Sequence, residues 1–148
     1  MSAGRTALLT ALVAVAVVAA DQVSKAIVRS EISRFEQVDL VLGIDLINAR
    51  NTGIAFSLFA GGGPIVAIVA VIALAALLGF FLTHLHRRLV WLPTGLLVGG
   101  AAGNLIDRVR LDAVTDFVKL PHWPAFNVAD IAVTGGVLVL IYVLERVK

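Results

Sequence analysis

Four long apolar segments constrain the fold more than any other feature of this sequence. They cover residues 7–28, 64–83, 89–106 and 129–144. A bilayer core about 30 Å thick is crossed by roughly 17–25 helical residues, and in lipid only helices and closed barrels satisfy every backbone polar group. The segments show no period-two alternation, which favours helices. We therefore expect a membrane protein of the all-α class, built as a four-transmembrane-helix bundle.

The composition agrees with this expectation and argues against several other classes of protein. Of the 148 residues, 59% are hydrophobic and 15% are charged, whereas soluble domains have about 45–50% apolar and about 25% charged residues. The net charge is only +2, and no basic stripe marks a surface for nucleic acid. The chain has no cysteine, which excludes a disulfide framework, a thiolate metal site and a thiol nucleophile.

The first apolar segment also has features of a cleavable signal peptide. Arg5 precedes a run of alanine, leucine and valine, and the run ends in Val-Ala-Ala at 18–20. However, apolar residues resume beyond Asp21, at Val23 and Ile27. A retained helix with a polar outer end fits this pattern better than a segment that is removed.

Basic residues predict how the chain is oriented in the membrane. They precede the first segment, separate the second from the third and follow the fourth, as Arg5, Arg87, Arg88, Arg146 and Lys148. Lysine and arginine in short loops favour the cytoplasmic side. With four spans these three places share one side, so both termini are expected in the cytoplasm. The loops 29–63 and 107–127 are then extracytoplasmic.

The first outer loop, residues 29–63, is expected to contain β-structure. Apolar residues alternate from Val38 to Leu46, which predicts one or two strands with one buried face. Gly43 interrupts this stretch and predicts a bend or bulge. A second apolar cluster, from Phe56 to Phe59, lies either at the lipid surface or against the helix ends. We expect residues 1–148 to form a single membrane-embedded domain with this small extracytoplasmic β-containing region.

Four aspartates fall in one layer of the predicted topology, on the extracytoplasmic side. They are Asp21, Asp107, Asp116 and Asp130. One explanation is that charges belong at helix ends. It accounts for Asp107, which could pair with Arg108, and for an Asn127 N-cap with Asp130 in the first helical turn. Asp112 is expected to be exposed to solvent.

Helix ends explain Asp116 and Asp130 less well, because both lie among apolar neighbours. Two carboxylates brought close in a site of low dielectric constant share a proton. Such a dyad can deprotonate a water molecule with one member and protonate a leaving amine with the other. A proton- or ion-coupled transporter subunit is the alternative, since intramembrane aspartates also relay protons. Transporter sites lie near the bilayer midplane, whereas these aspartates are predicted near its surface.

Five short motifs make the sequence resemble a known family. In chain order they are "DQVSK" (21–25), "NTGIAF" (51–56), "GNLIDR" (103–108), "VTDF" (114–117) and "FNVAD" (126–130). Together, on a chain of this length and hydropathy, they resemble lipoprotein signal peptidase, also called signal peptidase II, the bacterial membrane aspartyl protease. The resemblance covers nearly the whole chain.

The resemblance implies an activity, partners and a location. The enzyme would remove the signal peptide from diacylglyceryl-modified prolipoproteins by cutting just before the lipidated cysteine. It would act as a monomer in the bacterial inner membrane, in contact with phospholipid. Its active site would lie near the extracytoplasmic surface, and it would use neither a cofactor nor a metal ion.

The resemblance also assigns roles to individual residues. Asp116 and Asp130 would be the catalytic dyad. Further positions would bind substrate or shape the site, namely Asn51, Gly53, Asn104, Asp107, Arg108 and Asn127, with Asp21 and Lys25 in support. One departure is the interval from Asp116 to Asp130, which is shorter than in many members of the family. It includes the sequence "PHWP" at 121–124.

Overall fold

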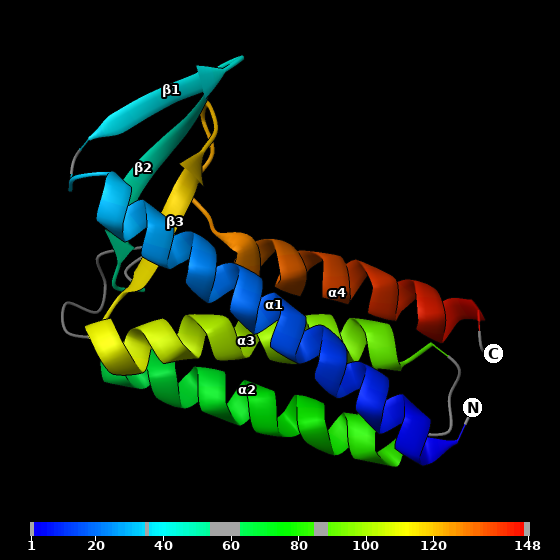
Figure 1. Ribbon diagram of the computed structural model, residues 1–148. Helices are drawn as coiled ribbons and strands as arrows, with labels where there is room; N and C mark the ends of the chain where they lie inside the picture. The colour runs from blue at the N-terminus through cyan, green and yellow to red at the C-terminus, as the bar shows by residue number, and fades with distance from the viewer. Residues whose placement is uncertain (1, 35, 54–62, 85–88, 147–148) are drawn as a thin grey trace.

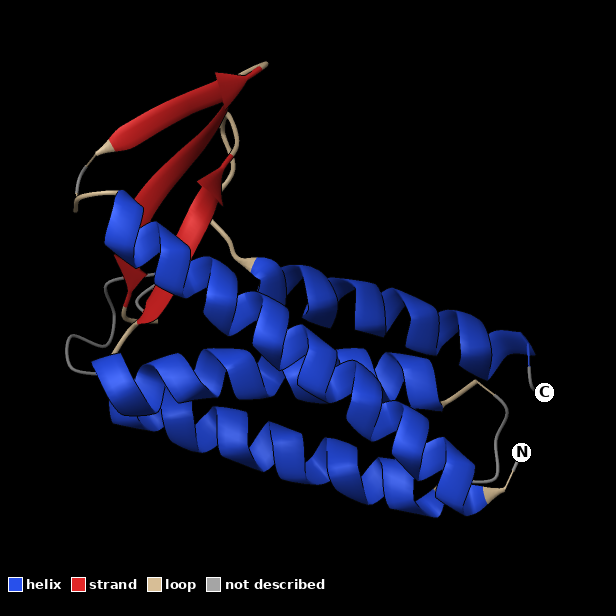
Figure 2. Ribbon diagram, in the orientation of Figure 1, coloured by secondary structure: helices blue, strands red, loops and turns tan. Residues whose placement is uncertain are grey.

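A computed structural model of the chain describes residues 2–34, 36–53, 63–84 and 89–146. The described part contains four helices and three strands. In chain order they are α1 (Ala3–Glu31), β1 (Gln37–Val41), β2 (Ile44–Asn51), α2 (Gly63–Thr83), α3 (Trp91–Leu111), β3 (Val114–Lys119) and α4 (Val128–Arg146). The helices form a bundle, and the strands form a sheet that rises from one end of it (Figures 1 and 2). Both termini lie at the other end (Figure 1).

Helix α3 packs against each of the other three helices. Its approach to α1 depends on glycines spaced four residues apart, Gly95, Gly99 and Gly103, which face successive turns of α1. Small residues at this spacing let two helix backbones come close together. At Gly103 this approach brings α3 against the buried side chain of Asp21 on α1.

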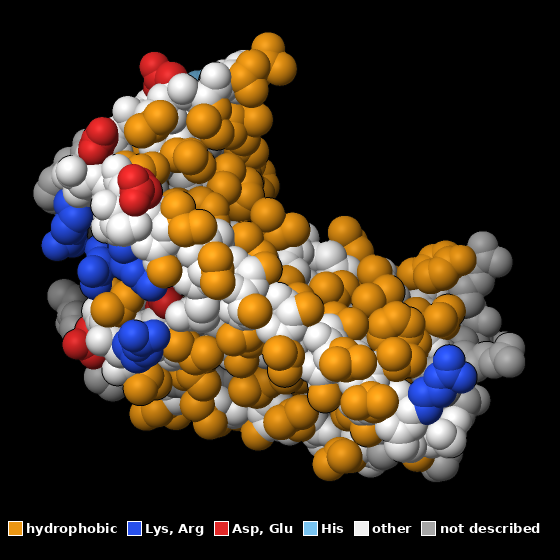
Figure 3. All heavy atoms as spheres, viewed as in Figure 1, with side chains coloured by type: hydrophobic (Ala, Val, Ile, Leu, Met, Phe, Trp, Pro, Cys, Tyr) orange, Lys and Arg blue, Asp and Glu red, His pale blue; other side chains and the backbone are white. Residues whose placement is uncertain are grey.

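The outer surface of the bundle is apolar. Figure 3 shows hydrophobic side chains covering the helices, with charged residues gathered toward the two ends of the molecule. Among the described residues, α1 and α4 are long and apolar enough to cross a membrane, and only 17% and 22% of their most apolar windows are buried. The core helices of soluble proteins are mostly buried. The described apolar part of α2 runs from Val71 to Thr83, so the count of four spans stays a prediction.

The two strands predicted in the first outer loop are present. They pair antiparallel, with Val38 opposite Leu46, and Leu42 and Gly43 form the turn between them with φ angles of 54° and 77°. Two successive positive φ angles are typical of the type I′ hairpin turn, so the bend predicted at Gly43 is confirmed. The cluster from Phe56 to Phe59 lies outside the described residues.

The expectation of one buried face was wrong for β1. All five of its residues are exposed, because β1 is the outer strand of the sheet and extends away from the bundle (Figure 2). The middle strand, β2, is half-buried over most of its length.

The segment around Asp116 forms a third strand, β3, where the sequence suggested a loop. It pairs antiparallel with β2, in the sheet order β1-β2-β3, and Ala49 lies opposite Asp116. A small core ties this sheet to the bundle, centred on Val28 of α1, Ile32 directly after α1 and Phe117 of β3. The core fixes β3 against the helix ends and so limits the movement of Asp116.

Two helices extend further than their apolar segments. Helix α1 ends at Glu31 and α3 ends at Leu111, so Asp21 and Asp107 lie within helices and not at their ends. Both side chains are almost completely buried. The expected exposure of Asp112 is confirmed, and this residue adopts a left-handed conformation (φ 55°) that ends α3.

Candidate active site

Asp116 projects from the buried strand β3, and its residue is only 3% exposed. Its two carboxylate oxygens accept hydrogen bonds from two asparagines. Asn51 Nδ2 donates to Oδ2 at 2.9 Å, and Asn127 Nδ2 donates to Oδ1 at 2.7 Å. These donors come from the end of β2 and from the residue before α4, so three segments distant in sequence meet at Asp116.

Asp130 lies in the first turn of α4 and is held from two directions. Asn127 Oδ1 accepts from the Asp130 backbone N–H at 3.0 Å, while Asp130 Oδ2 accepts from the Asn127 N–H at 3.1 Å. This reciprocal pair is a capping box, which satisfies two N–H groups that the helix leaves open. Asn104 Nδ2 of α3 donates to Asp130 Oδ1 at 2.8 Å. The predicted N-cap role of Asn127 is therefore confirmed.

Asn127 contacts both aspartates, through its side chain at Asp116 and its backbone at Asp130. The two carboxylates are close enough to interact electrically. Burial raises the pKa of Asp116 above its ordinary value of 3.8, and the negative charge of Asp130 raises it further. Hydrogen bonds from Asn51 and Asn127 and the positive charge of Lys25 act in the opposite direction. The net effect is a pKa of Asp116 above its ordinary value.

Gly53 orients one of these hydrogen-bond donors. Its backbone N–H donates to Asn51 Oδ1 at 2.9 Å, which leaves the Asn51 amide nitrogen facing Asp116. Gly53 has a φ angle of 84°, a conformation that glycine adopts without steric cost. Arg108, by contrast, makes its one described hydrogen bond to the Asn104 carbonyl at 3.4 Å, within its own helix.

The remaining two aspartates lie behind this pair in a buried polar cluster. Lys25 Nζ is 2.8 Å from Asp21 Oδ2 and 3.4 Å from Asp107 Oδ2. Arg29 Nη1 also lies 3.8 Å from Asp107 Oδ1. The expected pairing of Asp107 with Arg108 was wrong, because one turn before the end of α3 Asp107 faces α1.

Three further residues that were not predicted from the sequence join this polar network, namely Gln22, Arg29 and Thr115. Gln22 donates to both Asp21 and Asp107 at 3.1 Å. Thr115 accepts from Arg29 through its hydroxyl at 3.1 Å. Gln22 lies three residues before Lys25 on α1 and Arg29 lies four residues after it, so helical periodicity was the signal that could have placed them near the site.

The short interval after Asp116 closes as a compact loop. Lys119 Nζ donates to the Trp123 carbonyl at 2.8 Å, and Phe126 exchanges backbone hydrogen bonds with Val118 at 2.9 and 3.0 Å. The chain thus returns alongside β3 before α4 begins. Asn127 is placed beside Asp116 in spite of the shortened interval.

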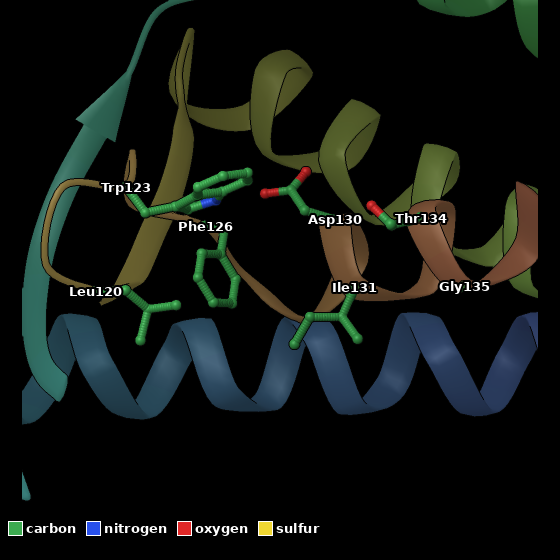
Figure 4. Close-up of a pocket in the computed structure, with 7 residues that line it drawn as sticks. All are labelled: Leu120, Trp123, Phe126, Asp130, Ile131, Thr134 and Gly135. Carbon is green, nitrogen blue, oxygen red and sulfur yellow. The ribbon is translucent and has the colours of Figure 1, made fainter. Parts of the chain in front are cut away.

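A pocket of about 410 Å³ opens beside Asp130 (Figure 4). One side is formed by residues between β3 and α4 and the other by the first turns of α4. The residues that line it are Leu120, Trp123, Phe126, Asp130, Ile131, Thr134 and Gly135. Its walls are mostly apolar, so it offers a hydrocarbon surface next to a carboxylate. Among the described residues, no group of three or more His, Cys, Asp or Glu side chains is arranged to hold a metal ion.

Comparison with known proteins identifies the family. Residues 13–145 match the family described as signal peptidase (SPase) II. The chain belongs to the signal peptidase II family. Similar proteins include the lipoprotein signal peptidase of Halothermothrix orenii, which is 32% identical over 93% of this chain and 96% of that protein. The lipoprotein signal peptidase of Syntrophomonas wolfei is 41% identical over 86% of this chain and 87% of its own length.

Solved structures of bacterial membrane enzymes share the fold of this signal peptidase II family member. One, described as a bacterial membrane enzyme determined at 1.9 Å, superposes with a TM-score of 0.85 at 32% identity and covers 91% of each chain. A second, determined at 2.3 Å, gives a TM-score of 0.84 at 31% identity over 93% of this chain and 87% of that one.

Family membership confirms the resemblance predicted from the five motifs. The chain is therefore an aspartic peptidase of the signal peptidase II type, a hydrolase of peptide bonds. The apolar helices agree with a membrane enzyme. The roles assigned to individual site residues, and the absence of a cofactor, stay predictions.

Proposed function

We propose that this chain is an aspartyl endopeptidase that removes the signal peptide from diacylglyceryl-modified prolipoproteins. It cuts just before the lipidated cysteine with a water molecule activated by Asp116 and Asp130. One observation carries the proposal: Asn127 donates hydrogen bonds to both carboxylates, which brings two aspartates from β3 and α4 to one place. The names of the similar proteins support the substrate class.

In the proposed reaction the two carboxyl groups divide the proton transfers. Asp130 borders the open pocket and takes a proton from the water, whose oxygen attacks the carbonyl carbon of the scissile peptide bond. Asp116, whose pKa is raised by burial, holds a proton and gives it to the leaving nitrogen as the C–N bond breaks. Water thus supplies the hydroxyl of the new carboxyl group, and the dyad ends with its proton on the other member.

The asparagines keep the dyad in its reactive geometry. Asn51, oriented by Gly53, and Asn127 leave Asp116 little freedom to rotate. Asn104 does the same for Asp130. Because orientation of reacting groups supplies a large part of the rate of many enzymes, we assign these side chains to shaping the site. Arg108 is assigned to the substrate side of the site, as the family motif implies.

The proposed setting is the bacterial inner membrane, with residues 1–148 forming one domain of four spans. Both termini are in the cytoplasm and the sheet is extracytoplasmic. Asp116 belongs to β3 and Asp130 to the first turn of α4, and these two segments lie at the end of the bundle away from the termini (Figure 1). That position suits a substrate whose cut site is held at the membrane surface by its lipid, and it suits a transporter less well. The enzyme acts as a monomer and needs no cofactor.

A cleavage assay with matched substrates tests this function. The purified chain, in detergent, is given one prolipoprotein in two forms, with and without diacylglycerol on its cysteine. We expect the modified form alone to be cut, with the new amino terminus at the lipidated cysteine. Equal cleavage of both forms would contradict the proposed substrate class, and cleavage of neither would contradict the activity.

A further inference from the structure

Two buried carboxylates each hold the residue that precedes a dyad aspartate. Asp21 Oδ1 accepts a hydrogen bond from the backbone N–H of Ala129 at 2.9 Å. Asp107 Oδ2 accepts one from the backbone N–H of Thr115, also at 2.9 Å. Ala129 comes directly before Asp130, and Thr115 directly before Asp116. The backbone on which each member of the dyad sits is therefore anchored from a different helix.

The two anchoring carboxylates are linked to each other through α1. Lys25 Nζ lies 2.8 Å from Asp21 and 3.4 Å from Asp107. Gln22 Nε2 lies one turn earlier and donates to both carboxylates at 3.1 Å. The link needs close packing, since a Cβ atom on Gly103 would lie 2.6 Å from Asp21 Oδ2.

The burial of this cluster makes its geometry stiff. The side chains of Lys25 and Asp21 are 0% exposed and that of Asp107 is 1% exposed. A buried charge is tolerated only with a partner in good geometry, and hydrogen bonds to charged groups are stronger than neutral ones. Movement of Asp21 away from Lys25 would break its ion pair, and Asp107 would keep only the longer contact with Arg29.

Lys25 also reaches the dyad by a second route. Its Nζ donates to Asn104 Oδ1 at 2.9 Å, and the Asn104 amide nitrogen donates to Asp130. Because an ammonium group only donates, it requires the oxygen of Asn104 on its own side. The nitrogen of Asn104 must then face Asp130. Asn127 Nδ2 donates to the same Asn104 oxygen at 3.1 Å, so Lys25 and Asn127 together fix the hydrogen bond that Asp130 receives from Asn104.

From these contacts we infer that Asp21, Lys25 and Asp107 form a buried bridge that sets the separation of Asp116 and Asp130. The three act as positioning residues, because they hold the backbone beside the dyad and touch neither of its carboxylates. The inference rests on the proposed function and extends it. It gives the charged residues of α1 a task in catalysis beyond stabilising the bundle.

The test compares three variants in detergent, each measured for melting temperature, kcat, KM and hydrogen exchange at the Thr115 and Ala129 amides. Lys25→Met removes the link. The double variant Asp21→Asn with Lys25→Met also removes the link but loses one negative and one positive charge together, and Asp107 keeps its ion pair with Arg29. It is used if Lys25→Met alone does not fold. Gly95→Ala is the matched control. Its Cβ would lie 2.6 Å from Val13 Cβ, so it disturbs the same helix pair two turns away from the cluster.

We expect both bridge variants to exchange faster at both amides. Lys25 contacts neither amide, and in the double variant the Thr115 amide is the decisive one, because Asp21 itself accepts from Ala129. Their kcat should fall roughly tenfold or more, with KM within about twofold of the wild type, because ground-state binding is preserved. Gly95→Ala should lower the melting temperature and leave both exchange rates and kcat per folded molecule unchanged.

Unchanged exchange at either amide, or a kcat within about twofold of the wild type, would overturn the bridge. So would a rise in KM alone. Asp116→Asn and Asp130→Asn are assayed in parallel to separate the two claims. If they stay active, the proposed function fails whatever Lys25→Met does. If they are inactive while Lys25→Met keeps its kcat, the bridge alone fails.

Discussion

At the scale of single residues, the site is an arrangement of hydrogen-bond donors around two carboxyl groups. Asp116 receives two amide N–H groups and Asp130 receives one amide and one backbone N–H. Donors to a carboxylate favour its charged form, whereas burial and a neighbouring negative charge oppose it. At Asp116 burial has the largest effect, so its pKa is raised in spite of its two donors.

Asn51 provides a test of this balance. Its hydrogen bond lowers the pKa of Asp116, so Asn51→Ala should raise that pKa further. If Asp116 must be protonated to serve the leaving amine, activity falls as the pH rises through this pKa. The basic limb of the kcat/KM profile should therefore move to higher pH in the variant. Asn48→Ala is the control, since Asn48 lies on the same strand and donates to the Ile32 carbonyl. A basic limb that stays in place or moves to lower pH would contradict the role of Asp116 as the acid.

Single residues also show what sequence reasoning could and could not predict. The exposure of Asp112 and the capping role of Asn127 follow from local sequence, and both were predicted correctly. The partner of Asp107 was not, because its side chain points from α3 to Lys25 and Arg29 on α1. Contacts between helices depend on the rotation of each helix about its axis, which an apolar run does not specify.

At the scale of helices and strands, glycines on α3 determine how closely α1 approaches. Gly103→Ala would place a Cβ atom 2.6 Å from Asp21 Oδ2. Overpacking of this kind costs typically about 1–3 kcal/mol, and here it also pushes on a buried charge. We expect a lower melting temperature together with a lower kcat. Gly79→Ala on α2, where a Cβ meets no atom within 4 Å, should change neither. A Gly103→Ala variant as stable and active as Gly79→Ala would contradict the packing described here.

The elements differed in how well the sequence predicted them. The helices were found from their apolar runs, and the β1–β2 hairpin from its alternation and Gly43. Strand β3 was missed, because it is six residues long and its partner β2 lies more than 60 residues earlier. No local pattern distinguishes a short buried strand from an apolar loop. Its pairing with β2 is nevertheless what brings Asn51 to Asp116.

For the whole molecule, the shape separates the termini from the dyad. The termini lie at one end of the bundle and the sheet at the other (Figure 1). Under the proposed function, the sheet end faces the outside of the cell.

Cysteine labelling tests this orientation cleanly, because the chain has no cysteine of its own. Single cysteines replace Gln37, on the outer strand of the sheet, and His86, between α2 and α3. A membrane-impermeant maleimide added to intact cells should label position 37 and not position 86, with both labelled after lysis. Labelling of position 86 in intact cells would reverse the orientation and place every site aspartate on the cytoplasmic side.

The central claim is that Asp116 and Asp130 act as one catalytic unit, and replacing each with asparagine tests it most directly. Asparagine keeps the shape of the side chain but cannot take the proton of water or return it. Cleavage of a diacylglyceryl-modified prolipoprotein by folded Asp116→Asn or Asp130→Asn should be abolished, with the loss in kcat and little change in substrate binding. The double variant should be scarcely worse than either single one, and Asp112→Asn, at an exposed position, should cleave normally. Near-normal turnover by either single variant would remove that residue from the mechanism and contradict the dyad.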